Sequence, residues 1–375
     1  MPNSSSSRKG VKFVDWEAIA KNSKQKRFEV AQRNRQRQRQ ELLDIHRGGP
    51  VALGMPPGEW QNFHANQLAE RQQELSALAP RMPLHHAHDE KPLGEYLIRR
   101  NADDRSIEGA ELERLRAANR SVEEARQKLD VGRGNVQEDI QRSGHDSTHR
   151  TLAARALVKF QKNNEFPPPG VSSQMRFGQI SASSAELTRA GNCGEHGDVT
   201  THVHATRLQT VDAVGKTSSI GVDHAWSELR HASGVASPHD VVMDAWAHGP
   251  AILREDSAFA HDPSDVHAEY SYDSTTASSG VQRVGQLLNH FQNNQQAHQV
   301  AANTLDQLRA QNHQQQKGVY LSTDVMDDQF VARTNNTVQS WSPLHQQLEA
   351  VKVARGLGAP VRNAVNWSES IFPPK

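Results

Sequence analysis

The single cysteine of the chain, Cys193, lies between two glycines, Gly191 and Gly194. Small neighbours allow a tight turn and let the backbone of a substrate come close. We expect a helix to begin at Cys193, because the free N–H groups and the positive dipole end of a helix favour a thiolate and can bind an oxyanion. A free cysteine taken alone is most often a buried structural residue. A nucleophile is therefore inferred only if a base and its partner accompany it.

A histidine and an aspartate follow the cysteine, each on a segment with the alternating pattern of a strand. Alternation places His224 and Trp226 on one face of the first strand, and Asp244 and Trp246 on one face of the second. If the strands pair through a loop at about 230–239, His224 and Asp244 lie side by side. Asp244 would then accept the Nδ1–H of His224 and turn the ring toward the thiol. The pattern predicts Cys193 as nucleophile, His224 as general base and acid, and Asp244 as the residue that orients it.

Two further residues are weaker candidates for the substrate cleft. Asn192, next to the nucleophile, is a candidate donor to an oxyanion hole through its backbone or side chain. Trp226 is interpreted as a core or cleft-wall residue, with a platform for the substrate as the alternative. We predict no metal ion and no cofactor. The histidines after Cys193, which are His196, His202 and His204, match no zinc spacing, and the histidines of 85–88 lie in a proline-flanked loop.

These groups require an α+β arrangement in which a cysteine-bearing helix packs on an antiparallel sheet. Helices are predicted over 59–78, 103–142 with a break at 132–134, 148–162, 193–205, 281–291 continuing through 292–316, and 343–355. Strands are predicted over 206–214, 220–229, 239–247 and 250–254, with shorter ones at 319–322 and 329–333. The Asp-, Ser- and Thr-rich stretch 255–280 is interpreted as a surface loop.

Composition separates a polar N-terminal part from a more apolar body. The chain has 375 residues, of which 35% are hydrophobic, with a formal net charge of +0. We divide it into a polar secretion and targeting region at 1–58, a helical region at 59–166, a catalytic domain at 167–356 and a tail at 357–375. One cysteine excludes an internal disulfide. The sequence contains no apolar run long enough for a membrane span, and Pro2 excludes N-myristoylation.

The first 58 residues are interpreted as disordered or as a targeting arm. Serines at 4–7 are typical of an uncleaved type III export signal. Arginines at every second position from 33 to 39 could bind a secretion chaperone or nucleic acid, or act as a localisation signal. Nucleic acid is disfavoured because no aromatic residues are interspersed among the arginines.

The three short motifs also resemble a known family. Gly191–His196 (GNCGEH), Asp223–Leu229 (DHAWSEL) and Val241–Trp246 (VVMDAW) are similar to motifs of the HopX/AvrPphE (XopE) effectors. These belong to the transglutaminase-like, papain-related superfamily and are injected by plant-pathogenic bacteria into host cells. The resemblance covers about 150–345 and implies the same triad of Cys193, His224 and Asp244. It also implies thiol hydrolysis of a host plant protein, in the host cytoplasm or nucleus.

The sequence leaves the reaction open among three alternatives. Water could resolve a thiol acyl-enzyme, as in a protease, amidase or deamidase, or an amine could resolve it, as in a transglutaminase. In the third alternative the chain is a module that binds a host protein and carries a vestigial triad.

Overall fold

The computed structural model describes residues 90–360, except 165–170, 220, 234–236, 261–264, 312, 314–317 and 322, together with 364 and 367. The predicted region 1–58, the helix at 59–78, the histidine loop at 85–88 and most of the tail at 357–375 lie outside the described residues.

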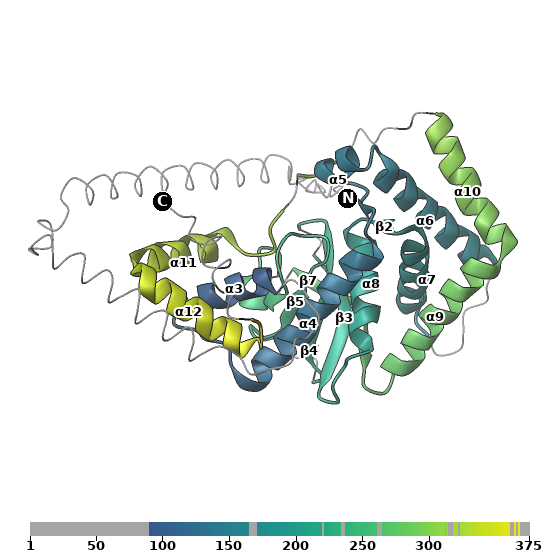
Figure 1. Cartoon of the computed structure of the whole chain (residues 1–375). Coiled ribbons are helices and arrows are strands. Elements are labelled where there is room, and N and C mark those ends of the chain that lie inside the picture. The colour runs from purple at the N-terminus through teal and green to yellow at the C-terminus, as the bar shows by residue number, and fades with distance from the viewer. Residues whose placement is uncertain are drawn as a thin grey trace, which may run out of the picture.

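A five-stranded antiparallel sheet, in the order β6-β5-β4-β3-β7, forms the centre of the molecule (Figure 1). Helices pack against it, so the described chain has the predicted α+β class. The strands are β3 (Asp212–Ser219), β4 (His224–His231), β5 (Val241–Met243), β6 (Ile252–Leu253) and β7 (Val266–Asp273). A separate parallel pair joins β1 (Gly132–Arg133) to β2 (Ala190–Gly191).

Several predicted strands were wrong in place or in kind. β3 overlaps the predicted 206–214 only at its first three residues and continues to Ser219, because its buried residues include polar ones such as Asp212 and Lys216 that hide the apolar alternation. β7 lies inside the predicted loop 255–280, where Tyr270 and Tyr272 point inward on an otherwise polar edge strand. At 319–322 only an isolated bridge forms, through Tyr320.

The predicted strand at 329–333 is instead the start of α11 (Asp328–Ser340). The Asp327 side chain accepts hydrogen bonds from the N–H groups of Gln329 and Phe330, which is N-cap geometry. Phe330 and Val338 are then buried two helical turns apart, on the side of α11 that faces the body.

The remaining helices agree with the predictions more closely. α8 (Cys193–Ala205) has the predicted bounds, and α6 (Asp146–Asn164) and α12 (Pro343–Gly356) contain theirs. The predicted helix 103–142 is divided at the glycines into α4 (Gly109–Lys128) and α5 (Gln137–Arg142). The 281–316 segment is two helices, α9 (Ala277–Asn293) and α10 (Gln295–Ala310), because Asn294 caps the second. Helices α3 (Lys91–Ala102) and α7 (Ser173–Thr188) were not predicted.

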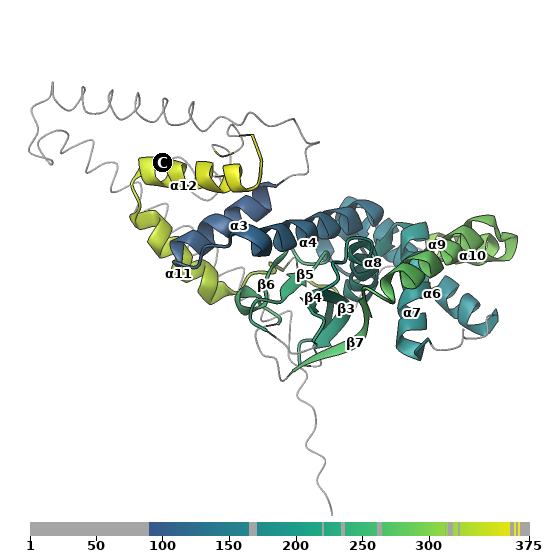
Figure 2. The same cartoon turned by 90° about the horizontal axis from the view of Figure 1, so that it is seen from below.

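Helices α4 and α8 lie on one face of the sheet, and α6, α7, α9 and α10 form a group beside α8 (Figure 2). Gly197 allows α8 to approach β4 closely, since a Cβ there would lie 3.3 Å from the Trp226 backbone. One hydrophobic core extends from Leu93 to Trp367 and includes residues on both sides of the predicted boundary at 166. Among the described helices, none combines the length and apolar character needed to cross a membrane.

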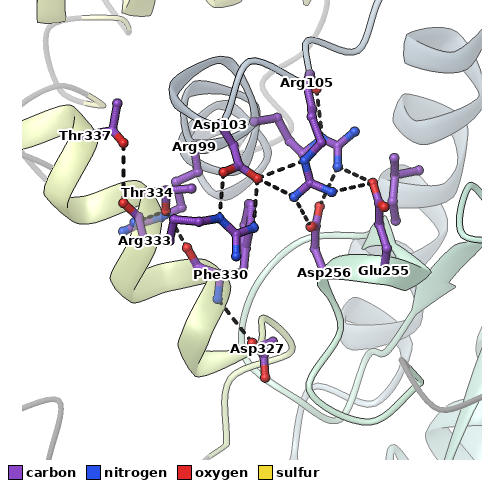
Figure 3. A network of polar contacts seen from close by, with 12 residues as sticks. Arg99, Asp103, Arg105, Glu255, Asp256, Asp327, Phe330, Arg333, Thr334 and Thr337 are labelled. Carbon is purple, nitrogen blue, oxygen red and sulfur yellow. Dashed lines mark hydrogen bonds and ion pairs between the residues drawn. The ribbon is translucent and has the colours of Figure 1, made fainter.

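A polar network ties α3 and α11 to the loop after β6 (Figure 3). Arg105 bridges Asp103 to Asp256, whose Oδ1 lies 3.0 Å from Arg105 Nη2, and Arg333 Nε lies 2.6 Å from Asp103 Oδ1. Asp256 belongs to a short 3-10 turn, η2 (Arg254–Asp256), and its carbonyl accepts the N–H of Asp327 at 2.8 Å. The network therefore fixes the chain that leads into the cavity described below.

Candidate active site

Cys193 is the first residue of α8 and follows strand β2 directly, with Asn192 as N-cap. The first bond of the helix is donated by His196 N–H to the Asn192 carbonyl at 2.9 Å. The N–H groups of Cys193 and Gly194 therefore have no acceptor within the helix. Glu195 accepts the Asn192 N–H at 2.8 Å, and Arg155 on α6 donates to Glu195 at 2.9 Å. The half-buried thiol thus lies at a helix N-terminus that side chains hold in place.

His224 begins β4, and Asp244 follows the last residue of β5. Pairing of Ser227 with Met243 brings the two side chains together, and His224 Nε2 lies 2.6 Å from Asp244 Oδ2. The predicted pairing of Asp244 with Nδ1 was wrong, and the strand predicted over 239–247 forms only over the three residues of β5. The carboxylate meets Nε2, the far nitrogen of the ring, which leaves Nδ1 for the hydrogen bond with Cys193.

The charges of this group stabilise one another. Burial alone would lower the pKa of His224, but the Asp244 carboxylate and the hydrogen bonds to Asp244 and Cys193 raise it to about 10. Burial would raise the pKa of Asp244, but attraction to His224 and its hydrogen bonds lower it. At neutral pH the imidazole is therefore protonated, and Cys193 is among the neighbours that stabilise that form.

The loop that carries Asp244 is fixed by helix α4. Asp244 Oδ1 accepts the N–H groups of Trp246 and Ala247, both at 3.0 Å. The guanidinium of Arg126 on α4 donates to four carbonyls of this loop, those of Asp244 (3.3 Å), Ala245 (3.2 Å), Ala247 (2.6 Å) and Gly249 (2.8 Å). Sequence reasoning missed Arg126, because a helical arginine carries no local sign of a distant partner.

Aromatic rings enclose His224. The Phe259 ring lies 4.4 Å from the imidazole between centroids, and those of Trp246 and Trp226 lie at 5.0 Å and 5.8 Å. Trp226 is fully buried, so it stacks beneath His224 as a core residue and does not line the cavity. Trp246 and Phe259 do line the cavity, and they restrict the motion of the ring.

Asn135 is a site residue that sequence reasoning missed. Asn135 lies two residues after the end of β1, and Cys193 lies two residues after the end of its partner strand β2. Asn135 Oδ1 accepts the indole N–H of Trp246 at 3.0 Å. Since an indole nitrogen only donates, this bond fixes the amide orientation and directs Nδ2 away from Trp246. Asn135 is buried and lines the same cavity as Cys193.

The predicted candidate Asn192 also lines the cavity, beside the thiol. Its backbone N–H is already donated to Glu195, so it is not available to an oxyanion. The candidate oxyanion donors that line this cavity are therefore the N–H groups of Cys193 and Gly194 and the side-chain amide of Asn135.

The cavity in front of Cys193 has a volume of about 910 Å³ and has walls of opposite charge. On one side, α6 contributes Arg155, Lys159 and Lys162. On the other side, acidic residues lie before β4 and at the start of α11; they are Asp223, Asp324, Asp327 and Asp328. The candidate nucleophile lies between the two walls.

The three other histidines of α8 have structural partners. His196 Nδ1 donates to the Asn192 carbonyl at 2.9 Å, His202 Nε2 lies 2.9 Å from the Tyr272 hydroxyl, and Ser121 bonds His204 at 3.0 Å. Burial lowers the pKa of His196 and His202 to about 4 and that of His204 to about 3. They are neutral core residues. In the described part of the chain no three His, Cys, Asp or Glu side chains group as metal ligands would.

Comparisons of this chain with protein-family models, with curated proteins and with solved structures found no match.

Proposed function

We propose that this chain is a cysteine-dependent hydrolase with a transglutaminase-like, papain-related core that cleaves amide bonds of a protein. The observation that carries the proposal is the buried His224–Asp244 pair at 2.6 Å, in one cavity with a cysteine at a helix N-terminus. A vestigial site would have no need to keep a buried charge pair, whose desolvation is costly.

The reaction proceeds through an acyl-enzyme. The Cys193 thiolate attacks the carbonyl carbon, and the resulting oxyanion accepts hydrogen bonds from the Cys193 N–H and Asn135 Nδ2. The imidazolium of His224 gives its Nδ1 proton to the leaving nitrogen as the carbon–nitrogen bond breaks. His224 then takes a proton from water, and the hydroxide attacks the thioester carbonyl. The carbon–sulfur bond breaks, which releases the acid product and restores the Cys193 thiolate. Asp244 stabilises the imidazolium throughout.

We further propose that the protein is a type III secreted effector that acts inside a host plant cell on a host protein. The three motifs shared with HopX/AvrPphE effectors and the serine-rich start support this assignment. The polar region 1–58 would supply the export signal and bind a secretion chaperone.

Acyl transfer to an amine is the second candidate, and the acidic wall favours it. Asp223 and Asp324 on that side of the cavity would attract a protonated lysine and place its nitrogen near the thioester. Water and an amine would then compete for the same intermediate.

The test is mass spectrometry of plant extract treated with wild-type protein or with Cys193→Ala. New peptide termini identify a protease, conversion of Gln to Glu a deamidase, and cross-links or incorporated amine a transglutaminase. Each product should be absent with Cys193→Ala. Identical peptide profiles for the two proteins would contradict both candidate functions.

A further inference from the structure

The end of the cavity bounded by α6 and α7 combines cations with an exposed aromatic ring. Lys159 and Lys162 lie about one turn apart on α6 and are both exposed at the cavity. Phe177 on α7 is 40% exposed, which is unusual for so large an apolar side chain. The Lys162 ammonium lies 5.4 Å from the Phe177 ring centroid, and that of Lys216 lies at 6.0 Å. The ring is therefore in contact with two cations.

Lys216 forms the floor of this end and remains charged despite its burial. It is only 4% exposed and lies 3.2 Å from both Asp198 Oδ2 and Glu269 Oε2. Burial would lower its pKa, but these two carboxylates raise it. Its ammonium has three N–H donors, lines the cavity and holds the two carboxylates in place.

This basic end adjoins the candidate nucleophile. A Cβ placed on Gly194, the residue after Cys193, would lie 3.8 Å from Lys216 Nζ. Burial would lower the pKa of Arg155, but the carboxylate of Glu195 and, to a smaller extent, the nearby Cys193 raise it. Lys159 follows Arg155 by one helical turn, and Lys162 contacts the same Phe177 ring as Lys216, so the basic end is continuous with the surroundings of Cys193.

The cations at this end are not all neutralised by the protein itself. Arg155 is paired with Glu195, and Lys216 with Asp198 and Glu269. Within the described residues, neither Lys159 nor Lys162 forms an ion pair. The opposite wall is acidic, so a negative group is attracted to one end of the cavity and repelled from the other.

We propose that the α6–α7 end of the cavity is a subsite for an anionic side chain of the substrate, close to the amide that Cys193 attacks. Lys159 and Lys162 bind the anion, a carboxylate or a phosphoryl group, and Phe177 packs against the apolar part of the same segment. This inference rests on the proposed function, because it names the substrate class of that site.

The first test needs no turnover. Cys193 is the only cysteine, so methanethiosulfonate reagents with an anionic, neutral or cationic tail report the potential at one atom. Lys159→Gln/Lys162→Gln should lower the rate ratio of anionic to neutral reagent by about two- to fivefold at low salt, since exposed charges within a Debye length are partly screened. The control Lys91→Gln/Lys352→Gln removes the same charge from α3 and α12, and should leave the ratio unchanged. Equal ratios in the two double variants would overturn the subsite.

The second test reads substrate preference from a peptide library made from plant protein. Asp, Glu or phosphorylated residues should be enriched on one side of the modified amide, and Lys159→Gln/Lys162→Gln should abolish the enrichment. Loss of enrichment after phosphatase treatment assigns a phosphoryl group, and its persistence assigns a carboxylate. Enrichment that is absent, or that the double variant retains, refutes the proposal. If no peptide is modified at all, the proposed function fails, while the reagent ratios still decide whether the anionic subsite exists.

Discussion

Replacing Asp244 by asparagine changes one charge in the site and keeps the shape. The Oδ1 atom at this position is held by the N–H groups of Trp246 and Ala247, both at 3.0 Å. An asparagine would keep its carbonyl oxygen there and turn its Nδ2 donor toward His224 Nε2. The neutral ring must then accept at Nε2 and carry its proton on Nδ1, which can no longer take a proton from the thiol. We expect the acylation rate to fall by roughly a thousandfold or more.

The same change has a magnitude that can be worked out for stability. In the wild type the pKa of His224 is raised from 6.5 to about 10, which corresponds to about 5 kcal/mol of stabilisation at about 1.4 kcal/mol per unit. Because the folded pKa is the higher one, this stability is fully present below pH 6.5. It is lost as the pH rises to about 10. Without the carboxylate, burial dominates, so the pKa of His224 in Asp244→Asn should fall below 6.5.

Urea unfolding at several pH values, together with NMR of labelled histidine, tests both expectations. Between pH 6.5 and 10 the wild type should lose several kcal/mol more of its unfolding free energy than Asp244→Asn. The His224→Gln spectrum identifies the resonance of His224. Asp240→Asn is the control, because this buried carboxylate accepts the Ser237 N–H and faces Arg254 rather than His224, and it should leave the pKa of His224 near 10. A wild-type His224 that titrates near 6.5, or the same pKa in both proteins, would refute the reasoning.

Three further predictions concern single residues outside the triad. Asn135→Ala should lower kcat about a hundredfold or more with little change in KM, because it removes an oxyanion donor. Steady-state kinetics on a peptide from the library measure both constants, and an unchanged kcat would contradict the role of Asn135 as an oxyanion donor. Asp256→Ala should cost about 3–5 kcal/mol in urea unfolding, since the buried Arg100, 3.1 Å away, loses a charge partner. A loss below 1 kcal/mol would mean that the network in Figure 3 adds little. Gly178→Ala should cost about 1–3 kcal/mol, because its Cβ would lie 2.4 Å from the Tyr270 ring; an unchanged Tm in thermal unfolding would show that the ring moves aside.

Local patterns in the sequence were enough for those elements whose burial is periodic and apolar. Helix α8 begins and ends where the sequence predicts, because the Asn192 cap and the glycines next to Cys193 are local signals. The strands β3 and β7 were misplaced, because no hydrophobic alternation marks either of them. In β3 the buried Lys216 forms an ion pair with Asp198 on α8, and the sequence gives no sign of this partner. α11 was taken for a strand because five residues are too few to separate the two periodicities.

The three groups proposed for chemistry could be selected from the sequence, because residue type and strand alternation depend only on neighbours along the chain. Alternation put His224 and Asp244 on one face, and the structure places them 2.6 Å apart. Which ring nitrogen meets the carboxylate could be read only from the tertiary structure, because it depends on the side-chain orientations of residues in two different segments. Arg126 and Asn135 could be found only in the tertiary structure, since each acts on a partner more than a hundred residues away in the chain. The polarity of the cavity was likewise decided by the fold, which sets the basic face of α6 opposite the acidic segment before α11.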